Sequence, residues 1–241
     1  MRYLINFSYD GSMFNGYQKQ PNLRTVQGCL EDALKFINGG CCIDIHSSGR
    51  TDKGVHAYNQ YAHFDMDRNI TLYKLKCALN TYTPDDIYIK DVRIVDNDFH
   101  ARYSVLKKEY IYKLNVGEYN PVNRNYVYQY NKKLDLDILR CEIKNLIGTF
   151  DYSAFCNMED KKNSYVRTIY SADVYKSKDE IVFSFVGNGF LKYQVRNMVG
   201  ALIECSTKGR HIKDILSSKN RSSFGRIADA CGLYLNNVYY K

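Results

Sequence analysis

The sequence predicts an α+β fold, because helix-like segments alternate with strand-like segments and several of the latter follow one another as hairpins. The 241 residues are 45% hydrophobic and 25% charged, which is typical of a globular chain with a sizeable core. No apolar run approaches the roughly 20 residues of a membrane helix. Residues 1–7 alternate like a strand and do not resemble a signal peptide, so we expect a cytoplasmic location.

The chain length fits two subdomains of roughly 100–120 residues each, which we place at 1–103 and 104–241. In the first, Thr25 can cap a helix that runs to about Asn38, where two glycines stop it. Pro84 bounds a second helix. The expected elements are strands at about 2–9, 42–48, 56–65 and 86–95, and helices at about 25–38 and 71–81.

The second half is expected to repeat this mixture of strands and helices, although no internal sequence repeat is evident. The stretch EYIYKL at 109–114 is strongly β-forming, and two later segments carry apolar residues at helical spacing. The expected elements are strands at about 109–114, 167–176, 180–187 and 233–239, and helices at about 134–147 and 190–206, with a basic segment after the last helix.

The charge favours a polyanionic partner, and the cysteines and histidines show no metal-binding pattern. The net charge is +8, although a merely basic protein with no such partner has the same balance. The eight cysteines include no C-x-x-C pair, and the five histidines lack zinc spacing, so we expect no metal. The basic residues gather at Lys107–Lys108, at Lys161–Lys162 with Arg167, and between Lys208 and Arg226.

The densest group of chemically active side chains lies in the stretch SGRTDKGVHA at 48–57. An arginine, an aspartate and a lysine stand between two glycines, and strand-like segments flank them. This pattern predicts a tight loop between strands, in which glycines can adopt a positive φ. In an extended segment Arg50 and Asp52 would point the same way. The spacing alone is equally typical of an Asx turn with a solvent-exposed ion pair that contributes little.

Seven segments in order resemble the TruA-type family of tRNA pseudouridine synthases. Residues 49–57 match that family's G-R-T-D-x-G-V-H-A signature. The other segments are 9–20, 25–31, 99–104 with Tyr110, 148–155, 190–200 and 232–240, so the resemblance spans nearly the whole chain. Four residues depart from the family's usual pattern, which has an indole, a small residue, a histidine and a proline at Tyr17, Lys53, Phe150 and Asp229 respectively.

The resemblance implies the pseudouridine synthase fold, with two similar mixed α/β subdomains whose largely antiparallel sheets flank a basic central cleft. It also implies isomerisation of uridine at positions 38, 39 and 40 in the tRNA anticodon stem-loop. The N1–C1′ bond breaks, the uracil turns over and C5 bonds to C1′. No redox step occurs and no group is imported, so no cofactor or metal is required. The expected partners are tRNA and a second copy of the chain in a homodimer.

The resemblance assigns the chemistry to four residues. Asp52 is the catalytic carboxylate, which could attack the sugar as glycosidase carboxylates do, or take a proton from C2′ or C5. Arg50 would hold the space of the extruded base, and Tyr110 would stack on the uracil. Arg196 would keep the carboxylate of Asp52 ionised. Three histidines are expected to be structural instead: His56, His63 and His100.

Three other interpretations remain open at this point. A non-catalytic RNA-binding protein could use the same scaffold, but the joint presence of Arg50, Asp52, Tyr110 and Arg196 argues against it. A glycosidase-like hydrolase would need a second catalytic acid, which is not evident. A synthase of the same scaffold could act on other RNA positions.

Overall fold

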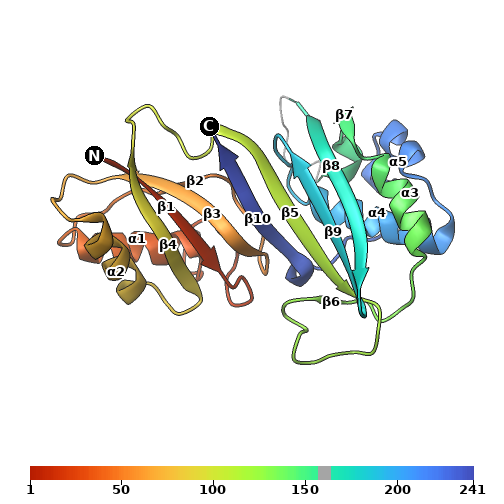
Figure 1. Ribbon diagram of the computed structural model, residues 1–241, viewed down its shortest axis with the longest axis horizontal. Helices are drawn as coiled ribbons and strands as arrows, with labels where there is room; N and C mark the ends of the chain where they lie inside the picture. The colour runs from red at the N-terminus through yellow and green to blue at the C-terminus, as the bar shows by residue number, and fades with distance from the viewer. Residues whose placement is uncertain (157–163) are drawn as a thin grey trace. The chain divides into compact units, whose positions relative to one another are not determined.

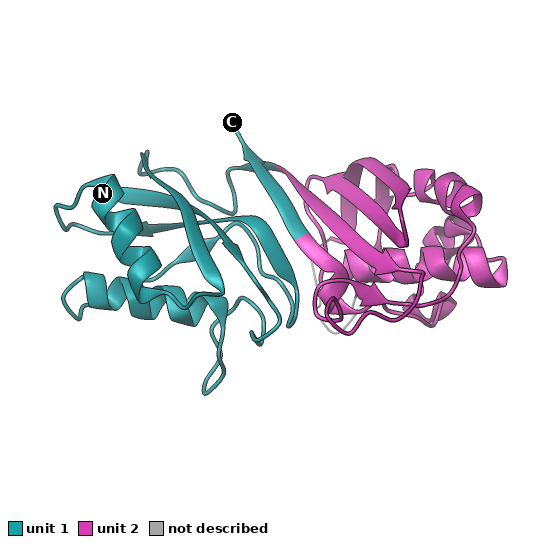
Figure 2. Ribbon diagram, turned by 60° about the horizontal axis from the view of Figure 1, so that its bottom comes forward, with its two compact units in different colours: residues 1–106, 235–241 teal, residues 107–234 magenta. Residues whose placement is uncertain are grey.

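The computed structural model describes residues 1–156 and 164–241 and divides into two compact units (Figure 2). Unit 1 comprises residues 1–106 and 235–241, and unit 2 comprises residues 107–234. The lysine pair at 161–162 lies outside the described residues. The sequence placed the last strand in the second subdomain. In the structure, β10 (Leu233–Tyr240) neighbours β3 (His56–Asp65), so most of β10 belongs to unit 1.

Unit 1 is a sheet with strand order β4-β1-β3-β10, and the short β2 pairs with β3. Strand β1 is antiparallel to both β3 and β4. Helices α1 and α2 lie together along one face of this sheet (Figure 1). The remaining elements of the unit are β1 (Arg2–Tyr9), β2 (His46–Ser47), β4 (Ile87–Val95), α1 (Val26–Ile37) and α2 (Leu72–Tyr82).

The local signals that predicted α1 are confirmed. The Thr25 hydroxyl accepts a hydrogen bond from the Gly28 N–H, which satisfies one of the orphan donors at the helix start. The apolar stripe is buried along its whole length, at Val26, Leu30, Ala33, Leu34 and Ile37. Burial of side chains of this size supplies the main stabilisation of a short helix, because helix propensity alone is weak.

Unit 2 has strand order β5-β9-β8-β7, and β6 pairs with β5. The pairs β5–β9, β8–β9 and β7–β8 are antiparallel and β5–β6 is parallel, so the predicted α+β class is confirmed. Helix α3 packs against β8 and α4. The elements are β5 (Val105–Asn115), β6 (Tyr128–Gln129), β7 (Gly148–Asp151), β8 (Val166–Ser177), β9 (Glu180–Gly187), α3 (Leu136–Lys144), α4 (Gln194–Lys208) and α5 (Ile212–Ser218), with single 3-10 turns at Ser153–Phe155, Arg221–Ser223 and Ala230–Gly232.

Several predicted elements have different bounds, and the sequence did not predict β6, β7 or α5. The strand expected at 42–48 is reduced to β2, which finds only two pairing partners on β3. The helix expected from residue 190 begins at Gln194, because Tyr193 has a φ of 64°, a left-handed conformation that does not continue a helix. The basic segment after α4 contains α5. Among the residues that the structure describes, no helix has the length and apolarity needed to cross a membrane.

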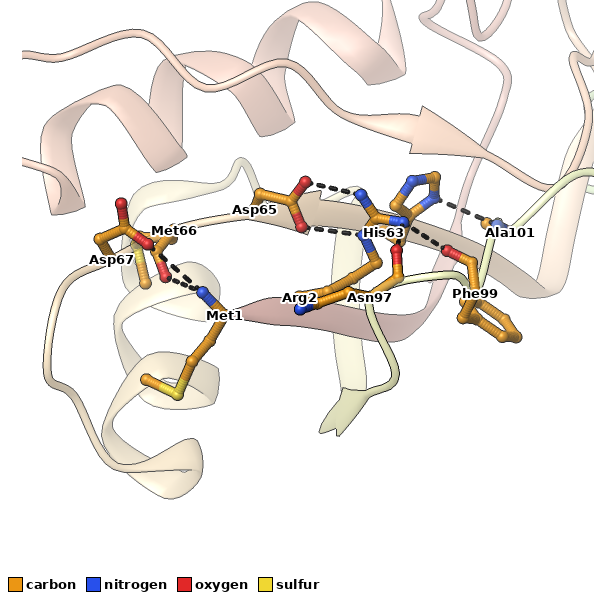
Figure 3. A network of polar contacts seen from close by, with 9 residues as sticks. All are labelled: Met1, Arg2, His63, Asp65, Met66, Asp67, Asn97, Phe99 and Ala101. Atoms are coloured by element: carbon orange, nitrogen blue, oxygen red, sulfur yellow. Dashed lines mark hydrogen bonds and ion pairs between the residues drawn. The ribbon is translucent and has the colours of Figure 1, made fainter.

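A polar network fixes the chain that follows β4 to the strands of unit 1 (Figure 3). Arg2 donates to both carboxylate oxygens of Asp65, at 2.9 and 2.7 Å, and also to the backbone oxygen of Phe99 at 2.8 Å. The Nδ1 atom of His63 accepts from the Ala101 N–H at 3.1 Å. A bidentate guanidinium–carboxylate pair is directional, so Arg2 holds both β3 and the segment after β4 in register with β1.

Three imidazoles gather beside this network. The ring centroids of His63 lie 5.1 Å from His46 and 4.6 Å from His100. His63 is only 2% exposed. Its burial, together with the nearby His100, Arg2 and His46, lowers the pKa of His63 to about 4, while Asp65 acts in the opposite direction. His63 is therefore neutral at neutral pH, which suits its role as an acceptor.

Acidification is expected to destabilise unit 1 through His63. The pKa of an unfolded histidine is about 6.5 and that of folded His63 is about 4, so the unfolded chain takes up the proton first as the pH falls. This group leaves stability unchanged above about pH 6.5. Between pH 6.5 and 4 the free energy of unfolding should fall by on the order of 2–3 kcal/mol, as measured by urea denaturation across that range.

The matched variant is His63→Asn, which can keep an acceptor near the Ala101 N–H and removes the titrating group. Its stability curve should be flatter between pH 4 and 6.5 than that of the wild type. An equally steep curve in the variant would assign the acid sensitivity to other groups.

Candidate active site

The loop from β2 to β3 has the turn geometry that the sequence predicted. Gly54 adopts a φ of 78°, and the Val55 N–H donates to the Asp52 carbonyl oxygen at 3.2 Å. Asp52 is half-buried and Arg50 is exposed. Both residues therefore lie on one tight loop of unit 1, with the carboxylate partly withdrawn from solvent.

Two tyrosines hold Thr51, the residue directly before Asp52. The Tyr17 N–H donates to the Thr51 carbonyl oxygen at 3.1 Å, and the Tyr9 hydroxyl bonds the Thr51 hydroxyl at 2.7 Å. Tyr9 is 4% exposed, and its burial raises its pKa to about 12, so its hydroxyl keeps the proton at neutral pH. Thr51 is fixed through both its backbone and its side chain, and this leaves Asp52 little freedom to shift.

Two glycines allow the segment after β1 to touch this loop. A Cβ on Gly11 would lie 2.0 Å from the Val55 carbonyl oxygen, a distance that no side chain tolerates. Gly16 has a φ of 94°, and a Cβ there would lie 3.0 Å from the Thr51 carbonyl oxygen. Glycine is therefore required twice, once for close backbone approach and once mainly for a positive φ.

His56 also links the segment after β1 to the loop that carries Asp52. The Gly11 N–H donates to Nδ1 of His56 at 3.0 Å, and the Asp10 carboxylate lies 3.2 Å from that nitrogen. Through this bond the His56 side chain ties the segment after β1 to the start of β3. The Asp10 carboxylate accepts from the backbone N–H and the hydroxyl of Ser12, at 2.9 and 2.6 Å.

Gln60 supports the start of the loop, a role that the sequence analysis did not find. It is fully buried on β3 and donates to the Gly49 carbonyl oxygen at 2.9 Å. Its side-chain oxygen accepts from the Ser48 hydroxyl at 2.5 Å. The sequence carried one signal for this role, a polar amide within a strand-like segment. The pattern YNQYAHF does not show whether that amide faces the core or the solvent.

Tyr110 lies in unit 2, on β5 opposite Phe185 of β9. It is 9% exposed, and its ring packs edge-on against Phe190 with centroids 5.1 Å apart. Tyr112, two residues further on, is fully buried, and its hydroxyl donates to the Asp229 carbonyl oxygen at 2.7 Å. That bond gives Tyr112 a structural role.

Arg196 also lies in unit 2, in the first turn of α4. It is half-buried, its Nε donates to the Ala228 carbonyl oxygen at 2.8 Å, and the Ala228 N–H donates back to the Arg196 carbonyl oxygen at 3.2 Å. Gly200 makes this contact possible, since a Cβ there would lie 2.1 Å from the Arg226 carbonyl oxygen. The bond from Nε therefore sets the direction in which the guanidinium points, and the backbone bond holds Ala228 beside it.

The predicted residues thus fall into two pairs, with Arg50 and Asp52 on one loop of unit 1 and Tyr110 and Arg196 in unit 2. A half-buried carboxylate on a fixed backbone can act as a nucleophile or as a base. An arginine held through Nε can bind an anionic group, and an aromatic ring at a strand can support a flat base. Across residues 1–156 and 164–241, no group of three or more His, Cys, Asp or Glu side chains is arranged to hold a metal ion.

Comparison with known proteins finds a matching family and similar relatives along nearly the whole chain. The family model described as tRNA pseudouridine synthase matches residues 5–104 and 143–241. A tRNA pseudouridine synthase A of Streptococcus agalactiae is 43% identical over 100% of this chain and 95% of that protein. Proteins of the same name from Anoxybacillus flavithermus and a Geobacillus species are 43% and 44% identical, each over 99% of this chain and 98% of the relative.

A methyl group at position 11 should separate the two segments that support Asp52. Gly11→Ala places its Cβ against the Val55 carbonyl oxygen, so we expect the free energy of unfolding to fall by about 2–3 kcal/mol. The matched control is Gly189→Ala, whose Cβ would meet no atom closer than the Arg167 Nε at 4.0 Å. Urea denaturation of both variants checks this, and equal losses in the two would show that the close approach has no special role.

Proposed function

The chain belongs to the tRNA pseudouridine synthase family, and we propose that it isomerises uridine to pseudouridine at positions 38, 39 and 40 of the tRNA anticodon stem-loop. It is an RNA isomerase. The proposal rests chiefly on the loop at 49–57, where Asp52 follows a threonine that is fixed through both backbone and side chain. The named positions are supported by the resemblance of seven ordered segments to the TruA-type enzymes.

In the proposed reaction the Asp52 carboxylate acts directly on the reacting atoms. The N1–C1′ bond of uridine breaks, the uracil rotates within the site, a C5–C1′ bond forms, the C5 proton leaves and N1 takes up a proton. Substrate and product are isomers, so atoms and electrons balance without another reactant. Asp52 either stabilises or attacks the electron-poor carbon, or it takes the departing proton. A rigidly placed carboxylate suits each of these roles, because little reorganisation is needed when the bond breaks.

Three other residues have supporting roles in the proposal. A base inside a stem is out of reach, so the target uridine leaves the stack, and the exposed Arg50 contacts the RNA backbone near the vacated space in this proposal. Tyr110 supplies a flat surface for the flipped uracil. Arg196, whose direction is set by Ala228, stabilises the ionised carboxylate of Asp52 or an anionic substrate group.

We further propose that the enzyme works as a homodimer that binds one tRNA across both subunits, in the cytoplasm. The dimer is supported by the resemblance to the TruA-type family, whose members share this arrangement. The location is supported by the substrate, because tRNA is a cytoplasmic molecule in bacteria, and the relatives named above are bacterial.

Replacing Asp52 should abolish product formation without abolishing tRNA binding. With an unmodified tRNA transcript, wild-type protein should form pseudouridine at positions 38–40, and Asp52→Asn should lower kcat by about 10⁴-fold or more, because the carboxylate acts in the chemical step. The matched control is Asp44→Asn, which removes an exposed carboxylate of the same unit. Mapping pseudouridine by position provides the measurement.

Product at other positions would preserve the chemistry and overturn the proposed substrate. A tRNA-binding wild type that formed no pseudouridine on any RNA would overturn the proposed function itself.

Binding of tRNA should weaken steeply as salt increases. The chain carries a net charge of +8, and RNA is read mainly through its shape and backbone. The logarithm of the binding constant should fall linearly with the logarithm of salt concentration, with a slope of roughly −0.7 to −0.9 for each phosphate contacted. Filter binding between about 50 and 200 mM salt gives this slope, and a flat line would contradict a backbone-reading enzyme.

A further inference from the structure

The turn between β4 and β5 is held unusually firmly for an exposed segment. Both backbone groups of Ala101 are bound by side chains, since its N–H donates to His63 at 3.1 Å and its carbonyl oxygen accepts from the Tyr240 hydroxyl at 2.7 Å. Ser104 closes the turn. Its hydroxyl accepts from the His100 N–H at 3.1 Å, and its own N–H donates to the His100 carbonyl oxygen at 2.9 Å.

This rigid turn presents a tyrosine to solvent. Tyr103 is 77% exposed, and its ring centroid lies 4.4 Å from that of His100, with the planes tilted by 38°. The His100 ring lies 4.6 Å from buried His63, so three rings form a row from the core outwards. The Arg102 guanidinium lies 5.9 Å from the Tyr103 centroid. An aromatic ring so exposed contributes little burial to the fold, although the turn beneath it is fixed by four hydrogen bonds.

We propose that Tyr103, backed by His100 and flanked by Arg102, is a stacking site for an unpaired nucleobase of the RNA substrate. The inference rests on the proposed function, which makes a stem-loop RNA the partner of this chain. Unpaired bases in RNA are recognised by stacking on aromatic rings and on guanidinium planes, and both groups stand side by side here. A tyrosine offers a large flat surface with only two side-chain torsions to fix, so binding it loses little conformational entropy.

The surroundings of Tyr103 suit this ligand. Burial and the nearby cations lower the pKa of His100, so its imidazole is uncharged at neutral pH and can serve as an apolar backing for the tyrosine ring. Arg102 is exposed and adds a positive charge beside the ring, which attracts the phosphate that accompanies any base. The bound turn cannot collapse onto the unit to bury the tyrosine, because Ala101 is held on both sides.

The test is binding of the full chain to an unmodified tRNA transcript, measured by filter binding. Tyr103→Ala should raise Kd by about 5- to 150-fold, the range found when a base loses its stacking partner. Tyr103→Phe should keep Kd within about twofold of the wild type, because stacking needs the ring and not the hydroxyl. Tyr73→Ala is the matched control, since Tyr73 on α2 of the same unit is also 77% exposed, and its Kd should match the wild type.

The dependence of Kd on salt separates stacking from charge. Tyr103→Ala should leave the slope of log Kd against log salt unchanged, whereas Arg102→Gln should reduce its magnitude by about one. A change of slope in Tyr103→Ala would mean that the variant had displaced charged groups. That result would overturn a stacking role.

The two proposals fail in different ways. A wild-type Kd for Tyr103→Ala would overturn the stacking site, while pseudouridine formed by the same wild-type preparation would preserve the proposed function. Weaker binding by Tyr103→Ala with no product from the wild type would preserve the stacking site and overturn the function. Sedimentation of Tyr103→Ala gives a third outcome. If the variant changed its oligomeric state but bound tRNA with the wild-type Kd, Tyr103 would be a contact between protein chains, and the stacking site would again be overturned.

Discussion

The contact between the backbone at Gly11 and the carbonyl oxygen of Val55 is the constraint on which the candidate site depends. Because no side chain intervenes, the segment after β1 can lie directly on the loop that carries Asp52. Tyr17 and Tyr9 then reach Thr51, and the Gly11 N–H reaches His56. The position of the carboxylate is therefore set by backbone packing across two segments about 40 residues apart, rather than by the loop's own preferences.

In unit 2 a close backbone approach at a glycine likewise supports Arg196, a candidate site residue. Gly200 lets the chain near Arg226 pass directly over α4, and this brings Ala228 within hydrogen-bond reach of Arg196. In unit 1 the close approach at Gly11 brings groups that fix Thr51, the neighbour of Asp52. In unit 2 the close approach at Gly200 brings a backbone carbonyl that binds the Arg196 side chain. A site of this kind tolerates surface changes and is sensitive to single methyl groups at the two glycines.

The sequence predicted the elements whose signals are local. The Thr25 cap and apolar stripe predicted α1, and the glycine-bearing turn before β3 has the geometry that its residues indicate. The sequence could not predict that β10 neighbours β3, because strand pairing depends on contacts distant in the chain. The left-handed Tyr193 and the supporting role of Gln60 were missed for a related reason, since both depend on tertiary packing that no local pattern records. The choice of Asp52, Arg50, Tyr110 and Arg196 came from resemblance, and their spacing alone would not have selected them.

The most direct test of the account follows the hydrogen on C5 of the target uridine. A tRNA transcript carrying tritium at C5 of its uridines is incubated with the wild-type chain, and tritium in water is compared with free uracil. Isomerisation forms a C5–C1′ bond, so the account predicts tritium in water, pseudouridine in the tRNA and no free uracil. Free uracil that retained its tritium would show hydrolysis of the N1–C1′ bond, and would contradict the assignment of this carboxylate to an isomerase.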